Sequence, residues 1–237
     1  DTTEKIISAF YEVEEVELAI EQSEAEDDLQ LNGEQRNAIR LAARHAFVCI
    51  TGGAGVVDVN GDVTLSSGTL TASSTTTRVS GNFNHSGGTF NHNSGTVELD
   101  GPGAQSLTSG GSSFNHLIHT GAGTVTQTDG LVLVGTLTHS AGTWSTGNFG
   151  VSVGNDLFMD GGTFNSGTSV VSVGDDYTQT SGDFNAPNAG GSFTTGLYFQ
   201  TGGTFVQGSG LVTVNGAMFV QGNGIYTGSA ATVDVNG

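Results

Sequence analysis

Basic residues are scarce in this sequence: its 237 residues include only five Lys and Arg against 23 Asp and Glu, so the formal net charge is −18. A surface of that sign repels phosphate backbones, which excludes nucleic acid as an expected partner. The single cysteine, Cys49, excludes an intrachain disulfide. No apolar run approaches the roughly 18 residues of a membrane-spanning helix, so no membrane span is expected.

Proline is also scarce, with two residues, whereas glycine is abundant, with 39. Only one of these glycines, Gly33, lies in residues 1–50, which hold 12 of the 23 acidic residues. The contrast predicts two domains, an acidic helical region at 1–50 and a glycine-rich β region at 51–237. Apolar residues at helical spacing predict helices over residues 3–20 and near 33–46. We expect this short helical appendage to act as a cap or an assembly arm.

A pair of apolar residues, two positions apart and closely followed by glycine, recurs about every 20 residues over the rest of the chain. A fixed period of this length, with two-residue alternation inside each copy, is typical of a solenoid. We therefore predict a mainly β, parallel β-solenoid of about eight or nine coils, each with about 20 residues and three strands. The pairs are Val57/Val59, Val97/Leu99, Val132/Val134, Val151/Val153, Val171/Val173, Val212/Val214 and Val233/Val235. The one longer step, 34 residues from Gly101 to Gly135, is interpreted as an extra, partly irregular coil.

Two further apolar columns accompany these pairs, so three inward columns are expected around a narrow, roughly triangular core. The second column is predicted at Val63, Phe83, Leu137, Leu157, Tyr177, Tyr198 and Phe219. The third is predicted at Leu70, Phe90, Phe114, Trp144, Phe164, Phe184, Phe205 and Tyr226. Asparagines beside the third column, among them Asn165 and Asn185, are expected to hydrogen-bond between coils.

The stretch from Gly81 to Leu107 begins Gly-Asn-Phe-Asn-His-Ser-Gly-Gly-Thr-Phe-Asn-His, and Ser113-Phe-Asn-His-Leu-Ile repeats its style. In this respect residues 56–237 resemble the glycine-rich repeats of large bacterial surface and adhesin-like proteins. The resemblance implies a β-solenoid with an extracellular, cell-surface location, and it implies no particular activity.

Residues 31–55 follow a different pattern, Leu31-Asn-Gly-Glu-Gln-Arg-Asn-Ala-Ile-Arg and later Thr51-Gly-Gly-Ala-Gly. This segment resembles the approach to the ATP-binding loop of RecD-type helicases, in which Gln35 would contact adenine. That family requires Gly-Lys-Thr/Ser next, because the Lys neutralises phosphate and the hydroxyl binds Mg²⁺. Here Gly55 is followed by Val56-Val-Asp, so the loop has no Lys and no metal ligand, and ATPase activity is not expected.

Two sets of residues are candidate metal ligands. Acid-rich turns offer carboxylates for structural calcium, and calcium prefers six to eight oxygen ligands. His92 and His116 each follow a third-column Phe by two residues, so they are expected to stack on neighbouring coils, where imidazoles can hold a transition metal. Solvated surface residues are the preferred explanation for both sets, so no cofactor is expected, with structural calcium left open. The carboxylates are Asp156, Asp160, Asp175 and Asp176.

Enzymatic activity is not expected from the repeat region. A polysaccharide lyase or hydrolase needs a base beside paired carboxylates. Arg78 is the only Lys or Arg after residue 50. Glu98, at the equivalent position of the next repeat, is the only acidic residue expected near it. The prediction is therefore a non-enzymatic structural or adhesive solenoid, with a carbohydrate-binding or carbohydrate-cleaving β-helix as the alternative. Surface glycans remain a candidate partner in either case.

One short motif occurs twice, Val56-Val-Asp-Val-Asn-Gly and Thr232-Val-Asp-Val-Asn-Gly. Open sheet edges recruit further strands unless they are covered. We therefore expect an assembly edge at Val57, Val59, Val233 and Val235, where the last coil of one copy meets the first coil of the next. Head-to-tail contacts of this kind do not close, and they build a homopolymeric filament.

Overall fold

The computed structural model describes residues 55–237, which form a parallel β-solenoid of about nine turns. The described part is mainly β and contains no helix. It belongs to a compact unit that runs from Ala54 to Gly237. The helices predicted over 3–20 and 33–46, and the boundary predicted near residue 50, lie outside the described residues.

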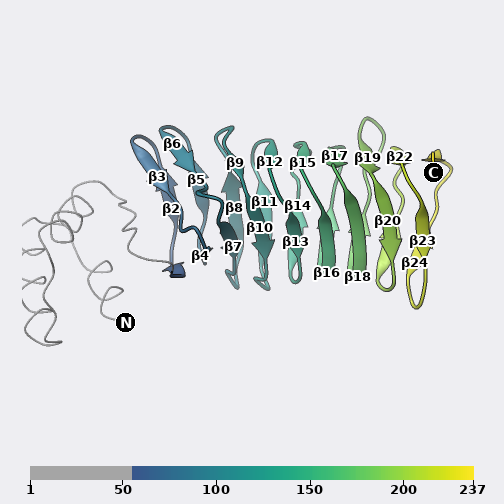
Figure 1. Cartoon of the computed structure of the whole chain (residues 1–237), viewed down its shortest axis with the longest axis horizontal. Helices are drawn as coiled ribbons and strands as arrows, with labels where there is room; N and C mark the ends of the chain where they lie inside the picture. Colours follow the sequence, from purple (N-terminus) through teal and green to yellow (C-terminus); the bar gives the residue numbers. More distant parts are fainter. Residues whose placement is uncertain (1–54) are drawn as a thin grey trace, which may run out of the picture. The chain divides into compact units, whose positions relative to one another are not determined.

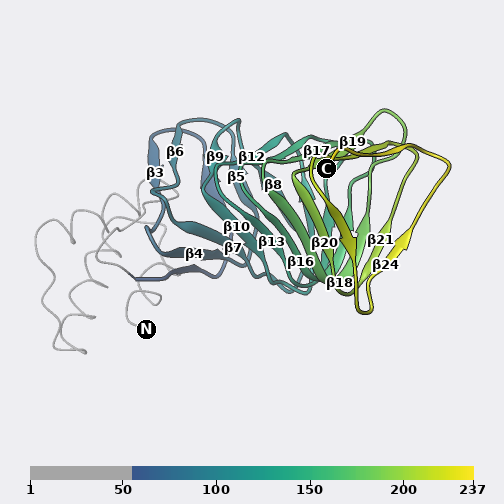
Figure 2. The same cartoon turned by 45° about the vertical axis from the view of Figure 1, so that its right-hand side comes forward.

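Each coil contributes three strands, so the solenoid has three faces (Figures 1 and 2). The first face is formed by β1 (Val57–Val59), β4 (Thr76–Val79), β7 (Thr96–Leu99), β10 (His116–His119), β13 (Leu137–His139), the first part of β16 (Leu157–Asn165), the first part of β18 (Asp176–Asn185), β20 (Leu197–Gln200) and β23 (Met218–Val220). The second face is formed by β2 (Val63–Leu65), β5 (Phe83–His85), β8 (Gln105–Thr108), β11 (Thr124–Gln127), β14 (Thr143–Ser145), the last parts of β16 and β18, β21 (Thr204–Val206) and β24 (Ile225–Thr227). The third face is formed by β3 (Thr69–Thr71), β6 (Thr89–Asn91), β9 (Ser113–Phe114), β12 (Leu131–Leu133), β15 (Val151–Val153), β17 (Val170–Val173), β19 (Ser192–Thr195), β22 (Leu211–Val214) and β25 (Val233–Val235).

Every strand pairs in parallel with the equivalent strand of a neighbouring coil, and on the third face β3 and β6 form a separate two-stranded sheet that does not pair with β9. On the first face, for example, Val97 pairs with Leu117, Leu117 with Leu137, and Leu137 with Leu157. Alternate residues of each strand point inward, so the inward positions of successive coils form continuous columns. The predicted parallel solenoid with three strands per coil is therefore confirmed.

Aromatic rings fill the core along the second face. Trp144, Phe164, Phe184 and Phe205 are fully buried, and successive rings from Trp144 to Tyr226 are stacked with centroids 5.0–6.0 Å apart. Beside this stack the Nδ2 group of Asn185 donates a hydrogen bond of 2.7 Å to Oδ1 of Asn165. The burial of these rings and the asparagine contact between coils confirm two predictions from the repeat.

The predicted columns change face at the 34-residue step. Before it, the Val/Leu pairs lie on the first face, in β1 and β7; after it, they lie on the third face, in β12, β15 and β17. The step is one full coil, from β7 to β10, followed by two sides of the next coil, from β10 to β12. The interpretation as a single extra coil was therefore wrong. Glycine follows an apolar pair at more than one corner, so the pattern alone does not identify the face.

Three residues predicted to face inward, Val132, Val134 and Phe219, face outward instead. Val132 and Val134 are 47% and 55% exposed, whereas Leu131 and Leu133 are each 2% exposed and belong to the core. Phe219 pairs with Phe199 on the outside of the first face, and Met218 takes the inward position opposite Tyr198. A shift of one residue reverses the facing of every side chain in a strand.

Glycines are required at one corner of the solenoid. Gly142, Gly162, Gly182 and Gly203 have φ between 62° and 72°, a region that L side chains rarely adopt. A Cβ on Gly162 would lie 2.5 Å from the carbonyl oxygen of Gly142 on the preceding coil. These coils stack closely at this corner because the positions carry no side chain.

Candidate functional sites

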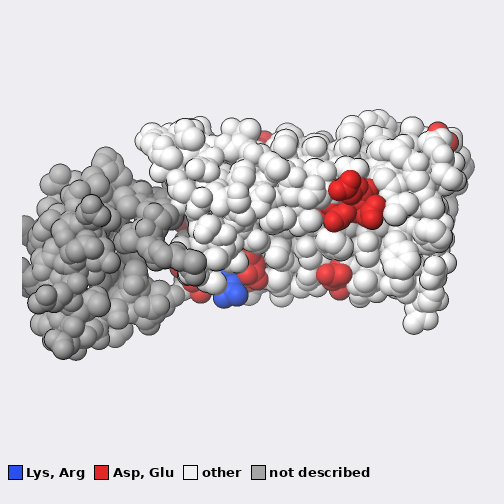
Figure 3. All heavy atoms as spheres, in the orientation of Figure 1, with Lys and Arg blue, Asp and Glu red and all other residues white. Residues whose placement is uncertain are grey.

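Of the candidate calcium ligands, Asp156 and Asp175 lie in the turns before β16 and β18, whereas Asp160 and Asp176 lie within these strands. Asp156 Oδ1 accepts the backbone N–H of Asp176 at 3.1 Å, and Asp160 Oδ1 accepts the hydroxyl of Thr180 at 3.0 Å. Asp175 is exposed, and its carbonyl oxygen accepts from Gly196 at 2.6 Å. Acidic side chains gather over the region of β16 and β18 on the visible face (Figure 3). In residues 55–237 no group of three or more His, Cys, Asp or Glu side chains is arranged to hold a metal ion.

His92 and His116 do not stack on each other. His116 pairs with Thr96 in the adjacent strand, and its Nδ1 contacts the hydroxyl of Thr136 at 2.8 Å. His92 lies in the corner after β6, where its Nδ1 accepts the backbone N–H of Ser94 at 3.0 Å. The expected stacking was wrong because the two histidines occupy different sides of their coils.

The histidines that do stack are His119 and His139, in β10 and β13. Both are fully buried, their ring centroids are 5.0 Å apart, and their Nδ1 atoms are 3.0 Å apart. Burial lowers the pKa of each imidazole from its ordinary value of 6.5 to about 4, and for His139 the neighbouring His119 adds to the effect. The Nε2 atoms of both rings are buried without a hydrogen-bond partner. His85 lies in β5 on the second face, so it does not belong to this pair.

Glutamines continue the same inward column of the first face toward the C-terminal coils. Gln179 and Gln200 are fully buried, and each accepts the phenol of the tyrosine two residues earlier, Tyr177 at 3.0 Å and Tyr198 at 2.9 Å. Their Nε2 groups donate to backbone carbonyls of neighbouring coils. Burial raises the pKa of both phenols well above 10. The amide and phenol groups of these four residues are hydrogen-bonded within the chain, so we assign them a structural role.

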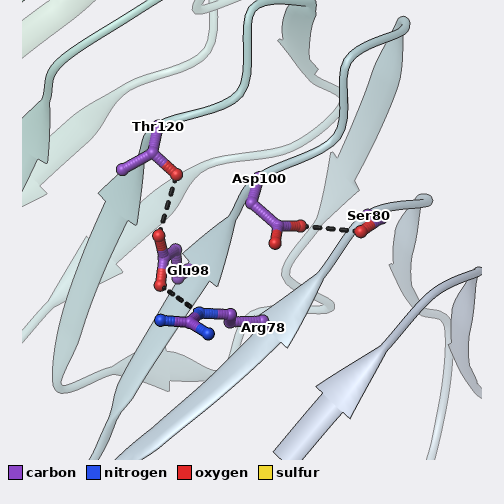
Figure 4. Close-up of polar contacts among 5 residues, drawn as sticks. All are labelled: Arg78, Ser80, Glu98, Asp100 and Thr120. Atoms are coloured by element: carbon purple, nitrogen blue, oxygen red, sulfur yellow. Dashed lines mark hydrogen bonds and ion pairs between the residues drawn. The ribbon is translucent and has the colours of Figure 1, made fainter.

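Arg78, the only Lys or Arg among the described residues, forms the blue group in Figure 3. Its Nε donates to Glu98 Oε2 at 2.9 Å, and Thr120 donates to Glu98 Oε1 at 2.8 Å (Figure 4). The nearby Asp100 accepts the hydroxyl of Ser80 at 2.8 Å. The hydrogen bond to Glu98 and its charge raise the pKa of Arg78. Both carboxylates are therefore held by side chains of adjacent coils, and Arg78, the one Lys or Arg in residues 55–237, is engaged with Glu98.

Exposed aromatic side chains gather at one place on the first face. Phe199 and Phe219 line an open pocket of about 270 Å³ together with Leu197, Asp176, Thr178 and Gln221. Two further phenylalanines lie outside the core, Phe149, which is exposed, and Phe158, which is half-buried. The sequence pattern had missed this pocket because it assigned Phe219 to the core.

The four residues of the predicted assembly edge lie at the two ends of the described solenoid but on different faces. Val57 and Val59 belong to β1, which pairs with β4 on the first face. Val233 and Val235 belong to β25, which pairs with β22 on the third face. The repeated motif therefore does not mark the same position in the first and last coils.

Within residues 55–237 no helix is long and apolar enough to cross a membrane. Comparison of the chain with protein-family models, with curated proteins and with solved structures finds no match.

Proposed function

We propose that the chain is a non-enzymatic structural protein of the extracellular surface, either a filament subunit or the stalk of an adhesin, whose copies stack head to tail. The observation that supports this proposal is the repeated parallel stacking of the coils, in which each coil covers the inward side chains of the coil before it. Met218, Tyr226 and Val233 face inward but are only half-buried. One coil earlier, on the same three faces, Tyr198, Phe205 and Val212 are 0–1% exposed.

The backbone of these strands gives a second argument for stacking. The outer edges of β23, β24 and β25 have no strand beside them among the described residues. Unpaired parallel edges recruit further strands, because each added strand satisfies a row of N–H and C=O groups. A second copy of this chain supplies strands of matching length, twist and apolar spacing.

The register indicates how two copies would meet. The inward column of the first face runs without a break from Val57 in β1 to Met218 in β23, through the coil-to-coil pairs described above. A copy stacked in register therefore places its β1 against β23 of the preceding copy. The duplicated Val-Asp-Val-Asn-Gly motif would direct β1 onto β25 instead, which requires a rotation of about a third of a turn.

A cysteine-pair experiment tests this arrangement in the full chain, with Cys49→Ser as the background. Asp58 and Phe219 are outward residues of β1 and β23 in one column, so Asp58→Cys copies mixed with Phe219→Cys copies should form intermolecular disulfides. Thr138→Cys, an outward residue in the middle of the same face, is the matched control and should not cross-link to Phe219→Cys. Strictly monomeric particles at high concentration, together with no cross-link above the control, would overturn the proposal.

The acidic surface and the resemblance to glycine-rich surface repeats support the extracellular location, with glycans as a further class of partner. The alternative of a carbohydrate-cleaving β-helix has less support, since Glu98 and Asp100 are both held by neighbouring side chains. A role in binding without cleavage would depend on the pocket on the first face, and ligand-binding measurements test it separately.

A further inference from the structure

Two phenylalanine rings stand side by side on the outer surface of the first face. Phe199 in β20 pairs in register with Phe219 in β23, and Thr178 of β18 precedes them in the same outward column. The ring centroids are 6.4 Å apart at an interplanar angle of 67°, an edge-to-face arrangement. The side chains are 37% and 45% exposed, whereas the inward aromatic residues of the coil before are fully buried.

A carboxylate borders the same pocket. Asp176 pairs with Leu197, whose N–H it accepts through Oδ1 at 3.3 Å. Its Oδ2 makes no hydrogen bond or ion pair within residues 55–237. Thr178 and Gln221 supply a hydroxyl and an amide at the rim, and Leu197 adds apolar surface.

Charge decides which small ligand suits this arrangement. The only basic side chain in the described part, Arg78, lies on β4 and is paired with Glu98, so Asp176 has no cation of its own. Aromatic faces attract cations, and a nearby carboxylate supplies the countercharge. A neutral ligand would use the rings but leave the carboxylate without a counter-ion.

We propose that this pocket binds an alkylated ammonium cation, with its methyl groups against Phe199 and Phe219 and its charge beside Asp176. Its open volume of about 270 Å³ accommodates a quaternary ammonium group. The pocket opens on the lateral surface of the solenoid, although Phe219 lies in β23 of the last described coil. Ligand binding uses outward side chains, whereas head-to-tail stacking uses strand edges and inward side chains, so the two proposals are tested by different measurements.

Choline and its neutral carbon isostere, 3,3-dimethyl-1-butanol, provide the direct test with the full chain. We expect saturable binding of choline by ligand-observed NMR or calorimetry, at least about ten-fold tighter than that of the isostere. Asp176→Asn should weaken choline binding about ten-fold while keeping an acceptor for the N–H of Leu197. Phe199→Leu should have a similar effect, because it keeps the apolar surface and removes the aromatic face. Asp160→Asn, which removes an outward carboxylate outside the pocket, is the matched control and should bind as the parent does.

Equal affinity for choline and the isostere would overturn the proposal, as would no saturable binding. An unchanged affinity in Asp176→Asn, with its circular dichroism intact, would also overturn it. Saturable binding of cellobiose in place of choline would reassign the pocket to neutral sugars. Sedimentation with phosphatidylcholine vesicles separates the two sources of the cation: binding to vesicles identifies a lipid headgroup, and binding to choline alone identifies a soluble ligand.

Discussion

The Nδ1 atoms of His119 and His139 lie 3.0 Å apart inside the solenoid, on adjacent strands and in register. Two imidazoles at this distance share one hydrogen, so one ring donates through Nδ1 and the other accepts. Both must be neutral, because a charged ring would be buried beside Trp144 with no counter-ion in the described core. Leu99 and Met159 occupy the same inward column in the coils on either side. The two histidines therefore stand at positions that are apolar in the neighbouring coils.

Acid is therefore expected to destabilise the solenoid through these two residues. Folding lowers the pKa values of both histidines to about 4, below the ordinary 6.5. Between these two values the unfolded chain therefore binds protons that the folded chain does not bind. Their contribution is complete above about pH 6.5 and is lost as the pH falls toward 4. Urea unfolding at pH 7.5 and pH 4.5 should show a loss on the order of 2–5 kcal/mol in the parent.

The double variant His119→Leu/His139→Leu should remove most of that pH dependence, because leucine in this column does not titrate. The carboxylates respond to acid in both proteins, so the comparison of parent and variant isolates the histidines. His92→Asn, at a corner of the solenoid, is the control and should retain the pH dependence of the parent. An identical loss of stability in the parent and the double variant would contradict this explanation.

The corrected facing of β12 gives a prediction with its own matched control. Leu133→Ala should lower the free energy of unfolding by about 2–5 kcal/mol, because it removes buried apolar atoms and leaves a cavity. Val132→Ala, one residue away but 47% exposed, should change it by less than about 1 kcal/mol. Thermal or urea unfolding measures both values. A larger loss in the Val132 variant would restore the facing that the repeat pattern predicted.

Alternation and corner glycines were sufficient to predict the solenoid. Alternation places every second side chain in the core, and glycine lets successive coils stack closely at the corners. The ring stack from Trp144 to Tyr226 followed from spacing alone. The change of face after Gly101 did not, since an apolar pair followed by glycine occurs on both the first and third faces. A sequence repeat records the period of the chain but not its phase around the axis.

The candidate sites were less predictable than the fold. Gln179, Gln200 and the His119–His139 pair are polar residues in inward positions, and hydrophobic patterning passes over such residues. Their pairing depends on the register between coils, which only the three-dimensional structure supplies. The pocket at Phe199 was missed for a related reason, since Phe219 had to be turned outward before two exposed rings could meet.

Close stacking at the glycine corner predicts a strong effect of one methyl group. Gly162→Ala should destabilise the fold by roughly 1–3 kcal/mol, since Gly162 has a φ of 63° and a Cβ there would crowd the carbonyl of Gly142 and the ring of His139. Gly150→Ala is the control, because its nearest atom would be 3.7 Å from the new Cβ. We expect the control to stay within about 0.5 kcal/mol of the parent or to be slightly more stable. Equal effects at the two positions in urea unfolding would show that this corner tolerates side chains.

The last prediction concerns the buried amide of Gln200, which joins three chain segments. It accepts the phenol of Tyr198 at 2.9 Å and donates to the carbonyls of Gly203 and Ile225 at 3.0 and 3.1 Å. Gln200→Leu keeps a side chain of similar size but leaves the phenol and both carbonyls without this partner, so it should cost about 2–4 kcal/mol. Tyr198→Phe alone should cost about 1 kcal/mol. In Tyr198→Phe/Gln200→Leu the unpaired phenol is gone, so the double variant should be more stable than the sum of the single losses predicts by about 1 kcal/mol. Strict additivity across the four proteins in urea unfolding would mean that Tyr198 and Gln200 stabilise the core independently, despite their contact.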